Sequence, residues 1–301
     1  MTVKVILNPY SNRWNAKARW PEAEAALKKA GVDFELAVSE RPHHVVELAE
    51  EAARQGFSPV VAAGGDGTIG EVVNGLARAA GENGGLLGPF GVIPLGSAND
   101  LVDNLGLPRD LNEAARVIAG GKTRNLDLGW VNGLYFANNS AMGLEPYITL
   151  IQQKITAIKG MTRYLVAAIR GVMDQPKWEG TIEWDGGKYE GPFVLVTVGN
   201  GPRTGGVFFM TPHADMFDGK LHFTYGYAKS RLKLFSLLTK AMKPGVGSYV
   251  EAQEIHEQDA TWIKIHTDRP TAAHVDGEIF AEDLHDLEYR IFPGKLKILM
   301  P

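Results

Sequence analysis

A glycine-rich loop at residues 64–68 constrains this chain more than any other feature of its sequence. An apolar run at residues 59–63 leads into Gly-Gly-Asp-Gly-Thr, and apolar residues at helical spacing follow directly. This pattern predicts a strand, a tight turn and the first turn of a helix. Glycines let backbone N–H groups approach an anion, and a helix start adds unpaired donors. Because a carboxylate repels phosphate unless a cation lies between them, Asp66 indicates Mg²⁺, a sugar hydroxyl or both.

A second predicted strand end has the same design. Residues 91–95 are apolar, and the turn after them contains Gly96, Ser97, Asn99 and Asp100 before another helix-like stretch. N-capping of that helix would also explain these polar residues, just as a turn that requires glycine would explain the first loop. Two such loops on neighbouring strands favour a shared ligand site, because the carboxyl ends of parallel strands meet at one edge of the sheet.

The fold class follows from the order of strand-like and helix-like stretches. Alternation over the first 120 residues predicts a parallel sheet covered by helices. Short strand-like runs then recur at residues 135–139, 181–184, 192–198, 221–227, 249–257, 262–266, 272–275 and 287–291. They indicate an antiparallel β-sandwich or open barrel. We therefore predict an α/β plus β protein, with a three-layer α/β nucleotide-binding domain over residues 1–125 and a β-sandwich domain with inserted helices over residues 126–293.

Two helices are expected to interrupt the β region. The first covers residues 146–173, with a break at Gly160 and an apolar stripe that packs against the sheet. The second covers residues 229–243 and is basic and amphipathic, a composition suited to anionic membrane surfaces. A core-packed helix with a solvated lysine face would explain it as well. Four of its basic residues are Lys229, Arg231, Lys233 and Lys240.

The composition excludes several classes of function. A formal net charge of -4 over 301 residues gives no basic field for nucleic acid. Cysteine is absent, which excludes disulfides, thiolate catalysis and Cys-ligated zinc. The chain starts with a strand-like segment, and no apolar run approaches the length of a membrane span. We expect a cytoplasmic protein that contacts a membrane at its surface and binds no nucleic acid.

A late motif supplies two further carboxylates. Residues 274–279 read His-Val-Asp-Gly-Glu-Ile, so that Asp276 and Glu278 flank a glycine in an apolar strand pair. Asp-Gly is a common hairpin turn, which by itself would explain the motif. The three motifs in this order, however, resemble the catalytic domain of diacylglycerol kinases and related lipid kinases. The first motif alone also resembles NAD kinases and phosphofructokinases.

The resemblance extends over nearly the whole chain and implies phosphoryl transfer that depends on ATP and Mg²⁺. It implies that Asp276 is the general base and that Glu278 orients the base or binds the nucleotide ribose. It further implies that Asp66, Asp100 and Asp127 arrange Mg²⁺ and its waters. The nucleotide-binding residues that it implies are Asn8, Ser11, Ser39, His44, Gly64, Gly65, Asp66, Gly67, Thr68, Glu71, Ser97 and Asn99.

A structural Mg²⁺ site is implied in the second domain by the same resemblance. Its ligands would be the Asp218 carboxylate and the backbone carbonyls of Asp215 and Lys220, although an ordinary β-turn also explains the Asp-Gly pair there. The family also implies that the last strand, within residues 294–301, returns to the first domain.

The chain departs from the family pattern at two places. Asn12 and Arg13 stand where relatives usually have glycine, and Gly70 stands where they commonly have asparagine. Asparagine tolerates left-handed backbone angles, so the opening loop is expected to survive. Arg13 is placed to contact phosphate, and none of the charged motif positions is missing.

The leading interpretation is a lipid kinase that phosphorylates the hydroxyl of a membrane lipid such as diacylglycerol, from a peripheral position at the inner face of the membrane. One alternative is an NAD kinase-like phosphotransferase, which would share the first motif but not the other two. Another is a non-catalytic nucleotide- or lipid-binding module, whose mark would be eroded carboxylates. The acceptor stays open among diacylglycerol, phosphatidylglycerol, a sphingoid base, ceramide and a polyprenol, and so does the oligomeric state, a homodimer included.

Overall fold

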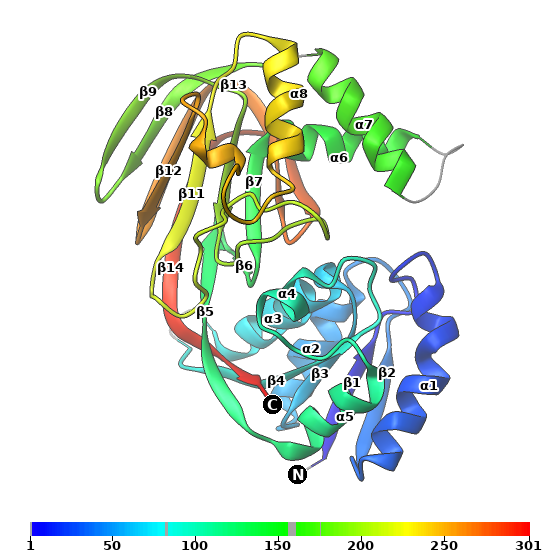
Figure 1. The fold of residues 1–301 in the computed structure, drawn as a ribbon. Helices are drawn as coiled ribbons and strands as arrows, with labels where there is room; N and C mark the ends of the chain where they lie inside the picture. Colours follow the sequence, from blue (N-terminus) through cyan, green and yellow to red (C-terminus); the bar gives the residue numbers. More distant parts are fainter. Residues whose placement is uncertain (1, 82–83, 156–160, 175) are drawn as a thin grey trace.

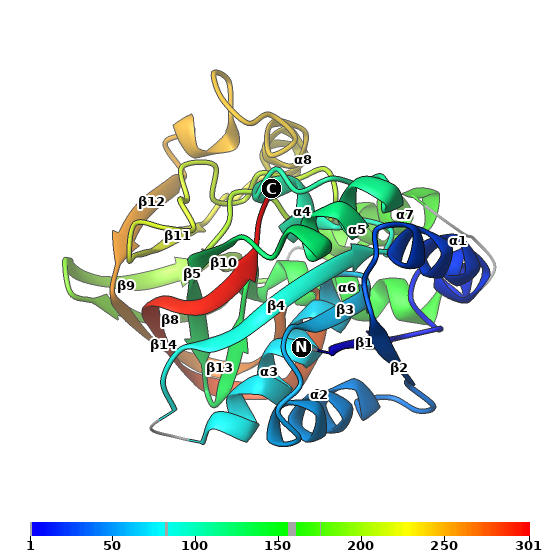
Figure 2. The same cartoon turned by 90° about the horizontal axis from the view of Figure 1, so that it is seen from below.

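The N-terminal half of the chain forms a parallel sheet between two layers of helices (Figures 1 and 2). The computed structural model describes residues 2–81, 84–155, 161–174 and 176–301. The sheet order is β2-β1-β3-β4, and each neighbouring pair is parallel. Its elements are β1 (Val3–Leu7), α1 (Asn15–Lys29), β2 (Phe34–Val38), α2 (His44–Arg54), β3 (Val60–Gly64), α3 (Asp66–Ala80), β4 (Leu87–Pro94), α4 (Asp100–Asn104) and α5 (Leu111–Gly120).

Helices cover both faces of this sheet, so its central strands β1 and β3 are mostly apolar, whereas the edge strand β2 is partly exposed. Side chains alternate along a strand, so Ile6 of β1 packs in the cluster with α2 and α3. Its neighbours Val5 and Leu7 pack in the cluster with α1 and α5. Both faces of the strands are therefore used for packing, and polar groups gather where the strands end.

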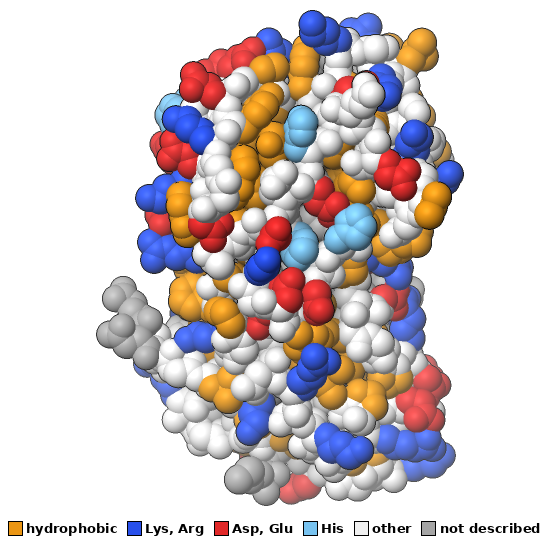
Figure 3. Space-filling view, turned by 60° about the vertical axis from the view of Figure 1, so that its left-hand side comes forward, with side chains coloured by type: hydrophobic (Ala, Val, Ile, Leu, Met, Phe, Trp, Pro, Cys, Tyr) orange, Lys and Arg blue, Asp and Glu red, His pale blue; other side chains and the backbone are white. Residues whose placement is uncertain are grey.

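The C-terminal half is an antiparallel β-sandwich with helices packed on one side. Its apolar core is rich in aromatic rings, among them Phe193, Phe223 and Tyr289. Lys, Arg, Asp and Glu side chains are interspersed on the side that carries β8 and β9 (Figure 3). The elements are β5 (Thr123–Val131), β6 (Leu134–Phe136), β7 (Asn139–Gly143), α6 (Leu144–Lys154), α7 (Met161–Asp174), β8 (Trp178–Trp184), β9 (Gly187–Phe193), β10 (Leu195–Gly199), β11 (Leu221–Gly226), α8 (Arg231–Lys240), η1 (Tyr249–Glu251), β12 (Ile255–Ala260), β13 (Trp262–Val275) and β14 (Glu278–Leu299).

Two long strands connect the halves. β14 has 22 residues and pairs with β13 in the sandwich. Its last residues pair in parallel with β4, with Ile298 opposite Phe90. β5 pairs antiparallel with the C-terminal part of β14, from Val131 opposite Tyr289 to Thr123 opposite Leu299. One continuous sheet thus passes through both halves of the molecule and fixes their relative position (Figure 2).

The predicted fold class is confirmed, while several strand predictions are wrong in detail. The strand expected at residues 135–139 is two strands, β6 and β7, separated by Ala137 and Asn138. The strand expected at residues 249–257 begins instead as the 3-10 helix η1, because Tyr249 is buried and its hydroxyl lies 2.8 Å from Oγ1 of Thr224. The run at residues 192–198 is shared between β9 and β10. Residues 262–266 and 272–275 belong to the single strand β13, and residues 287–291 belong to β14.

The two inserted helical regions also differ from expectation. The helix predicted at residues 146–173 is a pair, α6 and α7, and the predicted break at Gly160 lies outside the described residues. The basic helix is shorter than predicted, because it runs from Arg231 to Lys240. Among the described residues, no helix combines the length and the apolar character that crossing a bilayer requires.

Candidate functional site

The two glycine-containing loops pack directly against each other. Gly65 ends the loop after β3, and Gly96 lies in the loop after β4. A Cβ on Gly96 would lie 2.3 Å from the Cα of Gly65, so this contact excludes side chains. The amide side chain of Asn99 closes the second loop, because it bonds both the N–H and the carbonyl of Gly96, each at 3.1 Å. These glycines therefore serve loop packing first, whatever ligand the loops hold.

This packing brings Asp66 and Asp100 to the same wall. Asp66 starts α3, and its Oδ1 accepts from the backbone N–H of Leu101 at 3.1 Å. Asp100 is buried and accepts from the N–H of Gly206 at 2.9 and 3.2 Å. Burial raises the pKa of both carboxyls, and burial together with repulsion from Asp66 raises that of Asp100 to about 7. Ionising both carboxyls is unfavourable because they are buried close to each other. A bound cation would offset their negative charge, so the pair favours cation binding.

Asp276 faces these carboxylates from the other domain. It lies in the tight turn between β13 and β14 with φ of 46°, and a Cβ on Gly70 of α3 would lie 3.3 Å from its Oδ2. Its carboxylate accepts from the N–H groups of Ala137, Asn138 and Asn139 at 3.1, 2.9 and 3.0 Å. Burial raises the pKa of Asp276 to about 6, against the opposing effect of these bonds. The result is a rigidly held carboxylate that accepts a proton close to neutral pH.

A cavity of about 470 Å³ contains all three carboxylates. The polar part of its wall combines loop residues of the N-terminal domain with Asp276 of the second domain. The apolar part comes from the second domain and includes side chains of α6, α8 and β10. The polar wall includes Asn12, Arg13, Asp66, Ser97, Asp100 and Asp276, and the apolar wall includes Leu144, Ile148, Leu195, Phe208, Met210 and Leu238. Such a cavity suits an amphiphile whose polar head reaches the carboxylates.

Other predicted nucleotide-binding residues meet on the far side of the loop after β3. Asn8, at the end of β1, donates from Nδ2 to Oγ1 of Thr68 at 3.2 Å. The Ser11 hydroxyl lies 2.9 Å from the same Thr68 oxygen. Three predicted residues from two strand ends are therefore in one hydrogen-bonded group. Ser97 belongs to the cavity wall instead, where its hydroxyl donates to Oδ1 of Asn12 at 2.6 Å.

Glu71 and Glu278 lie together beside the start of α3. A Cβ on Gly67 would lie 2.7 Å from Oε1 of Glu278, so glycine lets that carboxylate approach the helix. Burial raises the pKa of Glu71, and Glu278 adds to the rise. The exposed ring of His43 lies 3.3 Å from Oε1 of Glu71. Sequence reasoning chose the neighbouring His44.

Two further predicted nucleotide-binding residues make bonds within their own loop. Nδ1 of His44 accepts from the backbone N–H of Glu40 at 3.1 Å. The Ser39 hydroxyl donates to the carbonyl of Arg41 at 3.2 Å. These bonds hold the loop after β2, and the predicted contact of Ser39 and His44 with a nucleotide stays a prediction.

Asp127 lies apart from the carboxylates of the cavity. It is buried in β5, and its two oxygens accept from the N–H groups of Gly219 at 2.7 Å and Gly294 at 2.6 Å. Its backbone carbonyl accepts from Nδ2 of Asn200 at 2.8 Å. Asp127 therefore ties the loop before β11 and the bend of β14 to β5. The predicted role of Asp127 in arranging Mg²⁺ stays a prediction.

The predicted structural metal loop has the hydrogen bonds of a tight turn. Oδ1 of Asp218 accepts from the N–H of Lys220 at 2.9 Å, and its Oδ2 lies 3.0 Å from Nε2 of His222. Asp215 accepts from the N–H of Phe217 at 3.0 Å. Each oxygen of the Asp218 carboxylate therefore has a partner within the protein. Metal binding by Asp215, Asp218 and Lys220 stays a prediction.

An arginine that the sequence did not single out joins the two domains. Arg203 follows β10, and its Nε lies 3.4 Å from Oδ1 of Asp100. Its guanidinium also bonds Asp103 and the carbonyl of Gly206. Asp103 in turn holds Arg109, with Nε to Oδ1 at 2.6 Å. No local motif marks Arg203, because its carboxylate partners are about 100 residues away.

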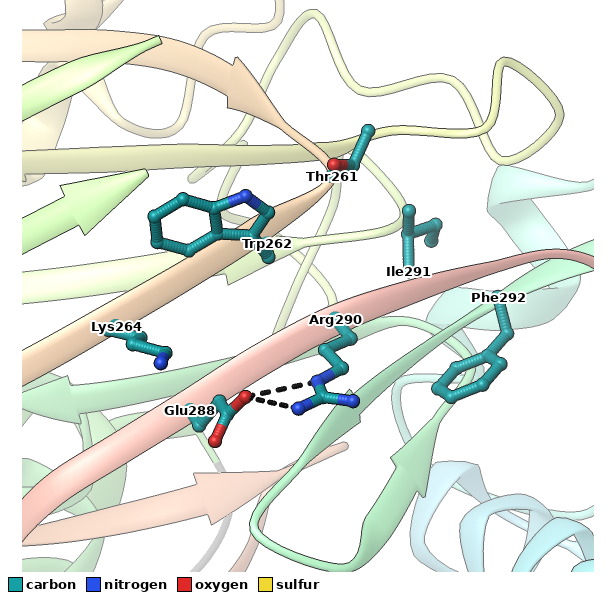
Figure 4. A pocket seen from close by; sticks show the side chains of 7 residues that line it. All are labelled: Thr261, Trp262, Lys264, Glu288, Arg290, Ile291 and Phe292. Atoms are coloured by element: carbon teal, nitrogen blue, oxygen red, sulfur yellow. Dashed lines mark hydrogen bonds and ion pairs between the residues drawn. The ribbon is translucent and has the colours of Figure 1, made fainter. Parts of the chain in front are cut away.

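A second hollow of similar volume lies on β13 and β14 (Figure 4). Its volume is about 490 Å³. Its wall includes Trp262, Lys264 and Phe292, and two further charged residues in it, Glu288 and Arg290, are paired with each other at 2.5 and 3.0 Å. Because Asp66, Asp100 and Asp276 line the other cavity and not this hollow, we assign the site to the cavity between the domains.

Comparison with known proteins identifies the family of this chain. Residues 2–131 match the diacylglycerol kinase catalytic domain, and residues 139–300 match the YegS C-terminal NAD kinase beta sandwich-like domain. A diacylglycerol kinase of Bacillus subtilis (strain 168) is 30% identical over 277 residues, which cover 91% of this chain and 89% of that protein. One from Staphylococcus aureus (strain MRSA252) is 28% identical over 276 residues, which cover 91% and 85%. The crystal structure of a diacylglycerol kinase from Bacillus anthracis strain Sterne shares the fold, with a TM-score of 0.78 at 23% identity, and covers 100% of this chain and 97% of that one.

Proposed function

This chain belongs to the diacylglycerol kinase family and is a lipid kinase, and from this premise we propose that it transfers the γ-phosphate of ATP to a hydroxyl group of a membrane lipid. One observation carries the proposal. A single cavity is lined both by a cluster of carboxylates and by apolar side chains. A lipid acceptor needs both, because its hydroxyl must reach the reacting phosphate while its chains stay out of water.

Asp276 is the general base of the proposed reaction. The acceptor oxygen bonds to the γ-phosphorus as the bond from that phosphorus to the β,γ-bridging oxygen breaks, and ADP leaves. The hydroxyl proton passes to the Asp276 carboxylate. Three backbone N–H bonds hold that carboxylate in one orientation, and a pKa of about 6 leaves it ionised at neutral pH.

The nucleotide would lie along the strand-end loops of the N-terminal domain. Asn8, Ser11 and Thr68 form the hydrogen-bonded group there, and Glu71 and Glu278 lie at the same helix start. Arg13 is the one Lys or Arg among the described residues that line the cavity. It would neutralise charge on the transferring phosphoryl group, which is a main requirement of this chemistry.

The carboxylates of the cavity fit Mg²⁺. Asp66 and Asp100 offer hard oxygen ligands, and burial raises the pKa of both carboxyls although Arg203 lies 3.4 Å from Asp100. In the part of the chain that the structure describes, no group of three or more His, Cys, Asp or Glu is arranged to hold a metal ion. Mg²⁺ commonly takes one or two carboxylates and completes its shell with waters and phosphates, so this set suits it. When bound, the ion would supply charge neutralisation between the phosphates.

Contact with a membrane would use the end of the second domain that carries α7 and α8, which lies opposite the N-terminal domain (Figure 1). On α7, the side chains of Leu165, Ile169 and Met173 repeat every four residues and are 52%, 43% and 48% exposed. Leu232 of α8 is 82% exposed. The neighbouring basic residues of α8 suit anionic lipid headgroups, and α6 and α8 also line the cavity.

The test is transfer of labelled γ-phosphate from ATP to a panel of lipids in mixed micelles, with Mg²⁺ and with EDTA. The panel contains diacylglycerol, phosphatidylglycerol, a sphingoid base, ceramide, a polyprenol and monoacylglycerol, and NAD is assayed beside it. The proposal predicts a labelled lipid in the presence of Mg²⁺. Label in NADP with no labelled lipid would contradict it.

A further inference from the structure

The segment of residues 137–139, which holds the Asp276 carboxylate, is anchored through the side chain of Asn138. Asn138 lies between β6 and β7 and is 2% exposed. Its backbone N–H donates to Oδ1 of Asp276 at 2.9 Å, and the N–H of Asp276 donates to the carbonyl of Asn139 at 2.8 Å. The turn and the segment are thus bonded to each other in both directions, so whatever fixes the segment also fixes the carboxylate.

The Asn138 side chain reaches across to the N-terminal domain. Its Oδ1 accepts from Nδ2 of Asn104, the last residue of α4, and its Nδ2 donates to the backbone carbonyl of Arg203 at 2.8 Å. Nδ2 of Asn104 lies 3.3 Å from the same carbonyl. A Cβ on Gly201 would lie 2.7 Å from Oδ1 of Asn138, so glycine at this position leaves room for the contact. Two amides and one carbonyl therefore connect the two domains.

The helix that Asn138 reaches carries the opposite wall of the cavity. Its first residue, Asp100, lies in that wall, and Asn104 follows one helical turn later on the same face of α4. The Arg203 guanidinium also contacts this helix, with Nε 3.4 Å from Oδ1 of Asp100. Asn104 is not among the described residues that line the cavity, so its amide acts on the site through Asn138 and Arg203. The hydrogen bonds thus run from Asp276 to the helix that starts with Asp100.

We propose that Asn138 is a positioning residue, which together with Asn104 fixes Asp276 relative to the wall of Asp66 and Asp100. The inference rests on the proposed function and adds a residue to its machinery. Phosphoryl transfer depends on the placement of the acceptor hydroxyl, its base and the phosphate, and a displacement of about 1 Å costs about 100-fold in rate. Because the Asn138 amide is buried, breaking its bonds would leave polar atoms without partners, which opposes such a displacement.

Two alanine variants test the proposal without removing a bond to the base. Asn138→Ala keeps the backbone N–H that bonds Asp276, and Asn104→Ala changes a side chain outside the cavity wall. On the lipid that the panel identifies, we expect each variant to lower kcat about tenfold or more, with KM for ATP within about twofold of wild type. The double variant should lose little more than the larger single loss, because both substitutions remove the same contact.

The pH profile separates this role from a loss of stability. The backbone N–H bonds favour the ionised form of Asp276, so a loosened segment would raise its pKa further above the ordinary value than the present pKa of about 6. We expect the midpoint of kcat/KM against pH to move up by about half a unit or more in both variants. Denaturant titration gives the free energy of unfolding of each variant, which establishes that it is folded in the assay.

Asn74→Ala is the matched control. Asn74 of α3 also joins the two domains through its amide, with Nδ2 2.8 Å from the carbonyl of Tyr135 and Oδ1 2.9 Å from its N–H. Its other bond is to the Gly70 carbonyl of its own helix. Because these bonds hold β6 and α3 and not residues 137–139, we expect Asn74→Ala to lose stability and to keep the wild-type pH midpoint.

The outcomes distinguish this inference from the proposed function. Lipid phosphorylation by wild type, with an unchanged kcat or an unchanged pH midpoint in both folded variants, overturns the positioning role and leaves the lipid kinase proposal standing. Losses that add in the double variant, or an equal shift of the midpoint in Asn74→Ala, overturn it too. Label in no lipid with the wild-type protein overturns the proposed function and the positioning role with it.

Discussion

Three aspartates line the cavity, and each is held by backbone N–H groups from a segment far away in the sequence. Asp66 bonds Leu101, Asp100 bonds Gly206, and Asp276 bonds the segment around Asn138. Hydrogen bonds to a carboxylate favour its ionised form, while burial and neighbouring negative charge oppose it. Burial is the larger effect at all three residues, so their pKa values are raised.

The first prediction concerns pH. Because burial raises the pKa of Asp276 to about 6, it is protonated below that pH and cannot accept the hydroxyl proton. We expect kcat/KM for the lipid acceptor to rise about tenfold per pH unit at acid pH and to level off above about pH 6. Steady-state rates at saturating ATP and Mg²⁺ between pH 5 and 8 test this. A flat profile over that range would argue against Asp276 as the base.

The second prediction separates structure from catalysis at Asp127. Asp127→Ala leaves the buried N–H groups of Gly219 and Gly294 without acceptors, so we expect the free energy of unfolding to fall by about 3 kcal/mol. Denaturant titration measures it, and Asp127→Asn, which keeps one acceptor oxygen, should lose less. Unchanged stability with abolished activity would instead support the metal role implied by the family.

At the scale of elements, α7 presents apolar side chains to solvent while α8 presents charge. Leu165, Ile169 and Met173 of α7 are each roughly half exposed. On α8, Lys233 lies 3.0 Å from Oε2 of Glu254, so part of its charge is already neutralised. We therefore expect two features to contribute to the proposed membrane contact. One is the apolar stripe on α7, and the other is the group of basic residues in and next to α8 that the sequence suggested.

The third prediction tests that stripe. Changing Leu165, Ile169 and Met173 together to Gln keeps the helix propensity of α7 and removes its exposed apolar area. We expect the affinity for phosphatidylglycerol vesicles to fall about tenfold or more in a flotation assay. Leu36→Gln with Val38→Gln on β2 is the matched control, because these side chains are 41% and 42% exposed in the other domain. Equal loss in both variants would contradict a docking role for α7.

The fourth prediction tests the charge on α8. Changing Lys229, Arg231, Lys233 and Lys240 to Gln should weaken binding to anionic vesicles at low salt. The difference from wild type should shrink at high salt, because salt screens exposed charges. Vesicle affinity that is untouched at low salt would show that α8 is an ordinary core-packed helix.

At the scale of the whole molecule, β14 and Arg203 link the two domains on either side of the proposed site. β14 belongs to both domains, pairing with β13 at one end and with β4 at the other. Arg203 from the second domain lies against Asp100 of the first. Asp276 is thereby held at the start of α3, beside Gly70.

The fold class could be predicted from the sequence, and the three motifs could be recognised in it, because both depend on the local spacing of residues. Strand ends in a parallel sheet converge, so Asp66 and Asp100 could be placed at one wall. Long-range partners had no local signal. Arg203, and the pairing of His274 with Glu145, join segments about 100 residues or more apart and became visible only in the folded chain. Tyr249 was misassigned to a strand because its burial against Thr224, and not the local pattern, decides its backbone.

The role of Asp276 as the base is tested most directly by the turnover of Asp276→Asn against wild type on the lipid that the panel identifies, with ATP affinity measured in parallel. Asparagine keeps the shape of the side chain and loses the basic oxygen. We predict a fall in kcat of at least about 100-fold, with ATP affinity within about twofold of wild type. Turnover near the wild-type rate would contradict the assignment of Asp276 as the base that serves a lipid hydroxyl in this cavity.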